Sequence, residues 1–412
     1  MANVGYSQSQ KLTGTAVPEQ DDHNRKTIAI IGGGPAASAT ALSFLRALKP
    51  PDDRPSAPSV SVKIFCEPPP NAIRVGESIP PAATPALRAL GLGDLLNNPV
   101  DKNNLHGPHR PCPGSTSLWS SKEPGYNDFM FEVMGHGYHL DRACFDSQML
   151  REAIIAGASV YQGWRLVGAR EYPEGALLEF SVPEKKRHTI KADFVVDASG
   201  LPAAYARRIG VMRNTLDDVV FLCAIVDMPA GEAMSERTLV ESVEDGWWYA
   251  ARLPDNKAII TYCTDAALVK EQNLRDPARW RQAFRNTVWL HHQIPASAVP
   301  DSISIIPRAA PSSLLSAVYG ESWLAVGDAA SSYDPISSAG ITKALMHGHD
   351  AGTAIAHKLI FGHTEKLQAY GRRVFHDFEQ FARVRAQLYG SESRFAGKPF
   401  WRRRLGLADN LP

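Results

Sequence analysis

The sequence is poor in cysteine and in net charge, and each shortage excludes a class of protein. Its five cysteines show no CxxC or other metal-binding spacing, and their odd number favours reduced thiols over a disulfide framework. We therefore expect a cytoplasmic protein without a metal site. The formal net charge of the 412 residues is only +1, which gives no reason to expect nucleic acid as a partner.

Long apolar runs are also missing. No segment approaches the roughly 20 apolar residues that cross a bilayer, and residues 1–26 lack the apolar centre of a signal peptide. We expect no association with a membrane and a flexible polar tail over residues 1–26. With 44% hydrophobic residues, the remaining chain is long enough for a large core and two intertwined domains.

A glycine-rich turn follows the first apolar segment, in KTIAIIGGGPAASATALSFLRAL. The pattern predicts a strand, a tight turn and a helix, and a proline-rich connection then leads to a second strand, VSVKIFCE. Gly32, Gly34 and Ala37 occupy the GxGxxG/A positions, which allow the turn, the approach of a pyrophosphate to the main chain and close packing of helix on sheet. Pro35 and Ala36 begin the helix whose N-terminus would face the phosphates.

Glu67 ends the second strand, where a carboxylate can accept hydrogen bonds from both hydroxyls of an adenosine ribose. The proline-rich connection places it further from the glycines than the usual ~20 residues. NAD and FAD both satisfy this pattern. The alternative is a glycine-rich turn that binds nothing.

A second corner of small residues lies in WLAVGDAASSYDPISSAGITKALMHG, between a predicted strand and a predicted helix. It suits a flavin, because an aspartate can accept a ribityl hydroxyl and helix-start amides can face the N1/C2 edge, where reduced flavin is negatively charged. A helix cap made by Asp334 or Ser337 is the alternative. The residues assigned to flavin binding here are Gly327, Asp328, Pro335, Ser338, Ala339, Gly340 and Ile341.

Four motifs occur in the order GGGPAA, RVGESIPPAATPALRALGL, VVDASG and GDAASSYDPISSAGI. In this order they resemble the FAD-dependent aromatic hydroxylase superfamily and, more closely, its tryptophan-halogenase-like branch. The resemblance covers about residues 27–360 and implies an α/β fold with a Rossmann-type FAD-binding domain, an inserted mixed β-sheet substrate domain and C-terminal helices. It also implies that Arg74, Ser78 and Arg142 contact the flavin, since LDR falls where such flavoproteins place an arginine.

The order of the expected elements divides the chain into discontinuous domains. Residues 27–110, 140–212 and 306–362 would form the FAD-binding domain, and residues 111–139 with 213–305 the substrate domain. Residues 363–412 would form a C-terminal helical segment. Its predicted helix carries one apolar stripe, made by Leu367, Tyr370, Val374, Phe378, Phe381 and Val384.

The resemblance weakens where halogenases need a lysine. Halogenases of this branch use it to convert hypohalous acid into a halogenating agent, but its position falls near His106, and Lys102 lies several residues early. Their WxWxIP pattern is also broken, as GWWYAARLP. We therefore treat halogenation as the less favoured alternative.

The segment from Tyr370 to Arg404 resembles the closing segment of flavoproteins that mature tryptophan-derived quinone cofactors, such as cysteine tryptophylquinone, in amine dehydrogenases and amino-acid oxidases. This resemblance implies an FAD-dependent monooxygenase that uses molecular oxygen to hydroxylate a tryptophan in a precursor polypeptide. Arg402, Arg403 and Arg404 would help that polypeptide dock, or would form a solvated basic tail. The alternatives are hydroxylation of a free aromatic molecule and a flavin-binding chaperone without activity.

The electron donor is expected to be a separate flavin reductase or free reduced flavin. No second GxGxxG motif occurs, and DASG lacks the acidic residue that single-component hydroxylases carry beside its last glycine.

Glu77, Trp247, Tyr249 and His139 are the predicted catalytic residues. In the resembling family the GES segment lies against the isoalloxazine ring; the alternative is that Glu77 caps a helix together with Ser78. Strand alternation places Trp247 and Tyr249 on one face and Trp248 on the other, with core packing as the alternative role. Four histidines after the GES helix offer an acid or base near neutral pH, with surface or core positions as the alternative: His106, His109, His136 and His139.

Overall fold

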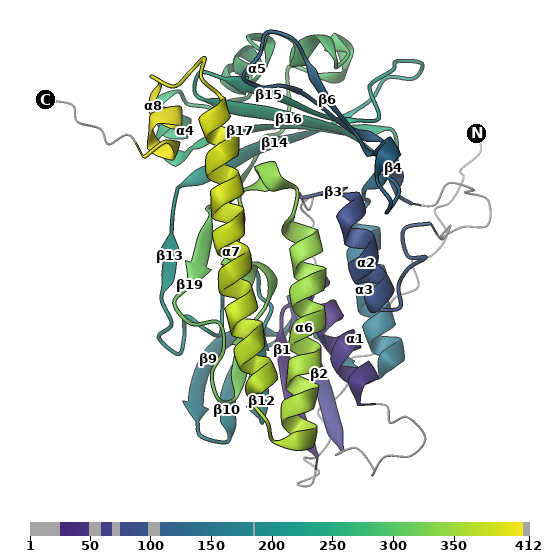
Figure 1. The fold of residues 1–412 in the computed structure, drawn as a ribbon, viewed down its shortest axis with the longest axis vertical. Helices are drawn as coiled ribbons and strands as arrows, with labels where there is room; N and C mark the ends of the chain where they lie inside the picture. Colours follow the sequence, from purple (N-terminus) through teal and green to yellow (C-terminus); the bar gives the residue numbers. More distant parts are fainter. Residues whose placement is uncertain (1–24, 49–58, 68–74, 98–107, 184–185, 407–412) are drawn as a thin grey trace, which may run out of the picture.

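A computed structural model describes residues 25–48, 59–67, 75–97, 108–183 and 186–406 (Figure 1). Almost all of the predicted N-terminal tail lies outside these residues, as do Arg74, Lys102 and His106. Among the residues described, no helix has both the length and the apolar character needed to cross a bilayer.

The glycine-rich turn belongs to a five-stranded parallel sheet with the order β8-β2-β1-β12-β20. Numbered along the chain, this is the 3-2-1-4-5 order of a Rossmann fold, in which ligands bind at the carboxyl ends of the strands where the order reverses. That point lies between β1 and β12. The strands are β1 (Lys26–Ile31), β2 (Val60–Cys66), β8 (Ser159–Gln162), β12 (Phe194–Asp197) and β20 (Trp323–Ala325).

Helices α1 (Pro35–Ala47) and α6 (Gly340–Phe361) pack against each other through two glycines. A Cβ atom on Gly348 would lie 2.6 Å from the Cβ of Ala39, and one on Gly352 would lie 2.5 Å from the main-chain oxygen of Thr40. The helices therefore approach more closely than larger residues would allow. Helix α3 (Arg142–Ala156) also contacts α1.

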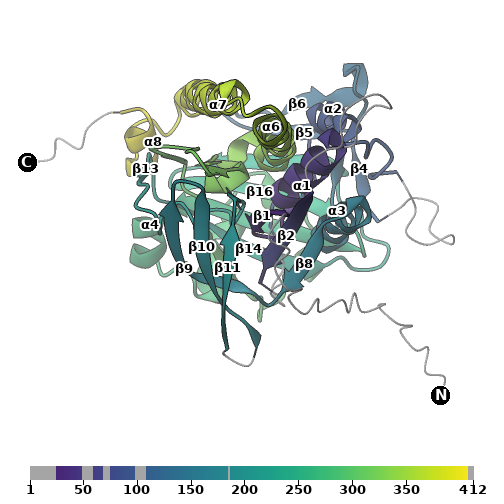
Figure 2. The ribbon, with the colours of Figure 1, turned by 90° about the horizontal axis from the view of Figure 1, so that it is seen from below.

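Figure 2 shows α1, α6 and α7 on one side of the parallel strands and a small antiparallel sheet, β9 to β11, on the other. The strands of this sheet are β9 (Arg165–Tyr172), β10 (Gly175–Ser181) and β11 (Arg187–Ala192). Two further sheets join distant segments: β3 (Ser78–Ile79) with β7 (Gly137–His139) and β4 (Arg110–Cys112), and β13 (Arg213–Thr215) with β19 (Ser313–Leu315) and β21 (Ser331–Ser332).

A seven-stranded sheet lies across one end of the parallel sheet and its helices, at the top of Figure 1. Its central strands pair antiparallel as predicted, and the β16–β17 turn contains Asp255 and Asn256 at φ +55° and +54°. The apolar side chains of α5 (Pro277–Arg285) pack on one face. The strands, in sheet order, are β18 (Ile306–Ala309), β14 (Val219–Asp227), β17 (Lys257–Asp265), β16 (Gly246–Leu253), β15 (Thr238–Val243), β5 (Gly114–Leu118) and β6 (Gly125–Asp128).

These layers confirm the predicted α/β fold with a mixed inserted sheet and C-terminal helices. The division into domains stays a proposal. Its boundary at residue 306 assigns β18 to the FAD-binding part, whereas β18 pairs with β14 of the seven-stranded sheet.

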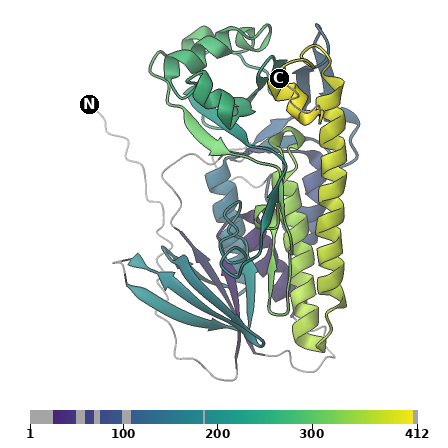
Figure 3. The same ribbon diagram turned by 90° about the vertical axis from the view of Figure 1, so that its left-hand side faces the viewer.

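Helix α7 (Glu365–Ser391) runs along most of the molecule in Figures 1 and 3, and α8 (Pro399–Arg404) follows it. The predicted apolar stripe of α7 is buried as far as Phe381, but Val384 is 52% exposed. Arg385 takes the next buried position, because it pairs with the carboxylates of Asp217 and Asp334. The stripe was therefore wrong at its last residue, where an ion pair replaces an apolar contact.

Candidate active site

A cleft of about 1280 Å³ opens at the carboxyl ends of β1 and β12. One wall comes from the Rossmann part, including Gly32 to Pro35 and Glu67. The opposite wall comes from the seven-stranded sheet and includes Ile225, Leu253 and Ile259. The cleft therefore lies between the glycine-rich turn after β1 and an apolar surface of the seven-stranded sheet.

The main chain shapes the first corner. Gly32 has φ +121°, and a Cβ there would overlap the main-chain oxygen of Ala198 in the DASG motif. Gly34 differs, because no described atom lies within 4 Å of a Cβ built on it. It caps α1 without a side-chain hydrogen bond from the described residues, so the helix-start amides face the open cleft. This cradle fits a pyrophosphate, whose charge the helix dipole stabilises.

Glu67 is exposed, follows directly after β2 and lines the same cleft as Trp164 and Arg165, while its contact with a ribose stays a prediction. Ala36 and Ala37 are buried, so they contribute packing rather than polar contacts.

The two small-residue corners meet. Gly327, at φ +61°, lies against α1, and a Cβ there would stand 2.8 Å from the Cβ of Ala36. Asp328 is half exposed, and its Oδ1 accepts a hydrogen bond of 2.8 Å from the ammonium of Lys343. Among the described residues, those lining the cleft do not include Asp328.

The segment before α6 contains both the predicted small residues and the alternative cap. The Asp334 carboxylate accepts a hydrogen bond of 3.1 Å from the Ile336 amide and caps the short turn Pro335–Ser337, so the capping interpretation is confirmed. Ser338 follows at φ +48°. Helix α6 begins at Gly340, and within the described residues no side chain caps it. Its first amides, including that of Ile341, therefore remain free for a ligand.

Glu77, Ser78 and Tyr249 form one hydrogen-bonded cluster. The Tyr249 hydroxyl donates to Oε1 of Glu77 and lies 2.6 Å from the Ser78 hydroxyl, and the Gly76 amide donates to Oε2 at 2.9 Å. Glu77 is only 3% exposed, yet it lines the cleft. Burial raises the pKa of Glu77, although the Tyr249 hydrogen bond opposes this shift. The helix-cap alternative is wrong, because the next helical turn begins only at Pro81.

Arg142 fixes the segment that carries Glu77. Its Nη1 donates to the main-chain oxygens of Val75 and Gly76 at 2.8 and 2.7 Å, while its Nε and Nη2 contact Asp146. Because Arg142 also lines the cleft, it joins the GES segment to α3 beside the proposed flavin position.

Trp247 and Tyr249 share one face of β16, as predicted, but only Tyr249 reaches Glu77. Trp247 is 1% exposed, and its Nε1 donates to the Tyr389 hydroxyl at 3.0 Å. Trp248 lies on the other face and stacks on Tyr262, with ring centroids 4.5 Å apart. The structure therefore places Trp247 in a core beneath α7 and Trp248 in a core beneath α5.

The described histidines do not join the cluster around Glu77. His139 is fully buried, with its Nε2 3.1 Å from the Thr238 hydroxyl, and burial lowers its pKa to about 4. Burial also lowers the pKa of His109 to about 4, and its Nδ1 accepts from the Asp141 amide. His136 is exposed. The two buried rings are neutral near pH 7, which supports the core alternative for them.

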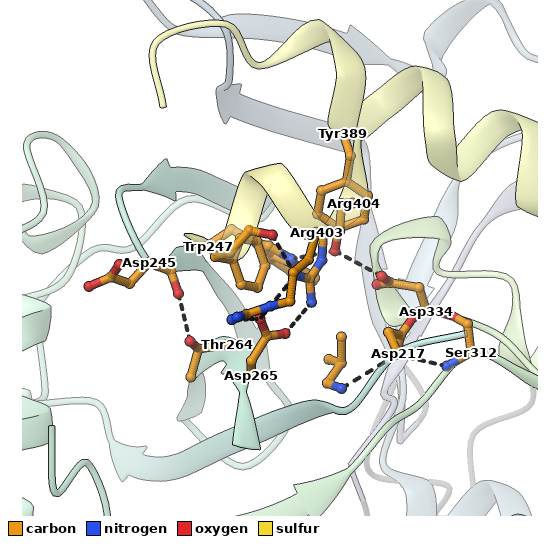
Figure 4. A network of polar contacts seen from close by, with 12 residues as sticks. Asp217, Asp245, Trp247, Thr264, Asp265, Ser312, Asp334, Tyr389, Arg403 and Arg404 are labelled. Atoms are coloured by element: carbon orange, nitrogen blue, oxygen red, sulfur yellow. Dashed lines mark hydrogen bonds and ion pairs between the residues drawn. The ribbon is translucent and has the colours of Figure 1, made fainter. Parts of the chain in front are cut away.

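A buried polar network that was not predicted supports the second corner. Asp334 is fully buried and accepts from the Tyr389 hydroxyl at 2.8 Å (Figure 4). It also accepts from Nε of Arg385 at 3.1 Å. Arg385 also contacts Asp217 at 2.8 Å. The predicted stripe of α7 did not include Arg385, and its partner Asp334 is 51 residues away in the sequence, so spacing along the chain did not indicate this pair.

The docking role predicted for the terminal arginines, and its alternative of a solvated basic tail, are both wrong for Arg404, whereas Arg403 is 39% exposed and its docking role stays a prediction. These side chains bind Asp265 at 2.5 and 2.6 Å, and that of Arg404 is 2% exposed (Figure 4). Asp265 is 1% exposed and needs a cation, which α8 supplies from within the chain.

Three possible metal ligands lie at the far end of α6. His357, His363 and Glu365 have ligand atoms within 4.8 Å of one another. They are separated from Gly340 by the length of the helix, so they do not belong to the cleft.

Comparisons with known proteins agree with this architecture. The profile of the tryptophan halogenase family matches residues 118–409. The putative FAD-dependent oxidoreductase LodB of Marinomonas mediterranea is 28% identical over 91% of this chain and 95% of its own length. The 1H-pyrrole-2-carbonyl-(peptidyl-carrier protein) chlorinase of Pseudomonas fluorescens is 25% identical over 79% of this chain and 74% of its own length.

Two solved structures are similar over nearly the whole chain. The flavin-dependent halogenase CmlS has a TM-score of 0.76 and 24% identity, covering 92% of this chain and 67% of that one. QhpG, a peptidyl tryptophan dihydroxylase essential for tryptophylquinone cofactor biogenesis, has a TM-score of 0.71 and 26% identity, covering 94% of this chain and 80% of that one.

Proposed function

The chain belongs to the tryptophan halogenase family of FAD-dependent oxidoreductases, and we propose that it is a monooxygenase that hydroxylates a tryptophan side chain in a partner polypeptide. The partner would be the precursor of an enzyme with a quinone cofactor of the cysteine tryptophylquinone type. The similarity to QhpG supports this substrate. The family itself supports halogenation as a second candidate.

The observation that carries the proposal is the cluster of Glu77, Ser78 and Tyr249 where the cleft meets the apolar wall. Bound as reduced FAD, the cofactor would supply two electrons for the reaction with O₂, in which one oxygen atom enters an indole C–H bond and the other leaves as water. The attacked carbon must then lose its proton. A buried carboxylate is suited to accept it, because a raised pKa makes Glu77 a stronger base than an exposed glutamate.

Tyr249 would hold Glu77 in place. Its hydroxyl connects the carboxylate to Ser78, so the base keeps one orientation while the indole binds. Arg142 holds the main chain of the same segment. The cluster thus combines a base with side chains that restrict its movement.

The cleft has room for a cofactor and a large side chain. Pockets for drug-sized ligands measure ~300–1,000 Å³, and this cleft measures about 1280 Å³. Gly34 and the start of α1 would hold the pyrophosphate, and Glu67 the ribose. The wall formed by Ile225, Leu253 and Ile259 would pack against the indole and exclude water.

The decisive experiment measures what is added to a tryptophan. The holoprotein is mixed with a flavin reductase, NADH, oxygen and a tryptophan-containing precursor polypeptide, with free tryptophan and indole in parallel, each with and without bromide. We expect oxygen to be added to the polypeptide only. Incorporation of bromine would establish halogenation instead, and oxidation of the free molecules alone would remove the polypeptide from the proposal.

The electron source is tested separately. NADH and NADPH should leave the bound flavin oxidised when no reductase is present. Rapid bleaching by either nucleotide alone would contradict the proposed separate reductase.

A further inference from the structure

A buried lysine lies behind the Gly327–Asp328 turn. Lys343, on α6, is 5% exposed, and its ammonium donates to Oδ1 of Asp328 at 2.8 Å and to the main-chain oxygen of Ser331. The same ammonium lies 4.1 Å from the centroid of the Tyr333 ring. Sequence reasoning did not single out this residue.

The surroundings of Lys343 make its charge depend on Asp328. Burial lowers the pKa of the ammonium, and the Asp328 carboxylate opposes that shift. A buried cation without a partner is strongly destabilising, so the ion pair and the Tyr333 ring stabilise Lys343 together. The Tyr333 ring stacks on Phe381 of α7, with centroids 4.2 Å apart, which fixes the aromatic side of the site.

Asp328 is the exposed partner of the buried ammonium. Its side chain is 51% exposed, whereas that of Lys343 is 4% exposed. In the part of the chain that the structure describes, hydrogen bonds to this carboxylate come from Lys343 through Oδ1. Arg213 fixes the main chain by donating to the oxygens of Ala329 and Asp328 at 2.6 and 3.2 Å. Lys343 and Arg213 therefore tie the turn to α6 and to β13.

We propose that Lys343 is a positioning residue for FAD: it orients Asp328 so that the second carboxylate oxygen accepts a ribityl hydroxyl, and it cancels the negative charge of the turn. The inference rests on the proposed binding of FAD at this turn. Removing Lys343 takes away the cation that is bonded directly to the Asp328 carboxylate and leaves only Arg213 nearby, so the turn becomes more negative and disfavours a flavin that gains negative charge on reduction. Removing the charge of Asp328 leaves an uncompensated ammonium, with the opposite effect.

The test measures the dissociation constant and the midpoint potential of bound FAD in Lys343→Met, Asp328→Asn and the double variant, without substrate. We expect Lys343→Met to weaken FAD binding by about tenfold or more and to shift the potential to more negative values. Asp328→Asn shifts it to more positive values. The double variant returns it toward that of the wild type, while FAD binding stays weak.

Lys358→Met is the matched control, because Lys358 also lies on α6 but pairs with Glu321 at the surface. It should change neither quantity. If Lys343→Met lowers only the free energy of unfolding and leaves affinity and potential unchanged, Lys343 is structural and the inference is overturned. Should that variant not fold, an unchanged potential in Asp328→Asn overturns it as well.

These measurements need bound FAD but no hydroxylation. A wild-type protein that binds FAD and does not oxidise tryptophan contradicts the proposed function and leaves this test valid.

Discussion

The two small-residue corners, Gly32–Ala37 at the cleft and Gly327–Ile341 packed against it, are stabilised in different ways. At Gly32–Ala37 the ligand would meet main chain only, and Gly34 leaves open space above a helix start. At the second corner the main chain is supported by two ion pairs, the half-exposed Asp328 with the buried Lys343 and the buried Asp334 with Arg385. The first corner depends on the absence of side chains, and the second on partners that must all be present. Substitutions should therefore damage the two corners in different ways.

The largest effect is expected from Arg385→Met. It leaves the buried carboxylates of Asp217 and Asp334 without their cation, which should lower the free energy of unfolding by ~3–5 kcal/mol. Arg383→Met removes an exposed pair with Glu379 on the same helix and should cost at most ~0.5 kcal/mol. Urea denaturation of both variants measures the difference. Equal losses would show that the second corner does not depend on its buried charges.

Gly32→Ala and Gly34→Ala sharpen the comparison within the first corner. At Gly32 a Cβ overlaps the Ala198 oxygen at positive φ, so a loss of about 2–3 kcal/mol in unfolding free energy is expected. At Gly34 the space is open and φ is −87°, so stability should hardly change. The new methyl group would instead meet the pyrophosphate and weaken FAD binding by about tenfold. Urea denaturation and FAD titration separate the two effects, and the same stability loss in both variants would contradict the assignment.

Tyr249→Phe and Trp247→Phe compare two residues on one face of β16. Loss of the Tyr249 hydroxyl removes a donor to Glu77, so turnover should fall by ~10–100-fold with little change in thermal stability. Loss of the Trp247 indole breaks its bond to Tyr389 and should cost ~1–3 kcal/mol while turnover of the folded enzyme stays close to wild type. Steady-state assays and thermal melts decide between them. If Trp247→Phe lowered turnover and Tyr249→Phe lowered only stability, the catalytic side chain would be Trp247 instead.

The smallest effect concerns the pH dependence of stability. Because burial raises the folded-state pKa of Glu77 above 4.5, the folded protein binds that proton more tightly than the unfolded chain. The unfolding free energy of the wild type, relative to Glu77→Gln, should therefore be greatest below about pH 4.5 and should fall as the pH rises through the folded-state pKa. Urea denaturation of both proteins over this range measures it. A difference that does not change with pH would mean that Glu77 titrates normally.

Local patterns were sufficient to predict the first corner and the antiparallel pairing of the central strands. The strand-turn-helix at Gly32 to Ala37 and the β16–β17 hairpin use turn residues adjacent in sequence, so their geometry follows from rules that act over a few residues. Val384 shows the limit of such rules. Hydropathy placed it in the stripe of α7, but the buried position belongs to Arg385, whose partner Asp217 is 168 residues away.

The same limit applies to the site. Tyr249 and Trp247 were both predicted to be catalytic, because both are aromatic and alternation places them on the same face of the strand. Only Tyr249 bonds to Glu77, whereas Trp247 bonds to Tyr389. What separates them is the packing of α7 on the sheet, which brings Tyr389 to Trp247. Pairing between distant segments is not encoded in spacing, and for this reason Lys343 and Arg404 were also missed or misassigned.

Gly348 and Gly352 lie where α6 crosses α1, and a Cβ on Gly348 would stand only 3.0 Å from the main-chain oxygen of Ala36, so the two glycines set the distance between the helices that carry the corners. Each corner is continuous with the start of a helix, α1 or α6, and the two glycines hold those helices at their closest approach. The two glycines therefore control the spacing between Gly34 and Gly340, the helix starts that we expect to face the coenzyme. A bulkier residue at Gly348 or Gly352 would push α6 away from α1 without touching any ligand, and it should weaken FAD binding by widening the space between the two helix starts.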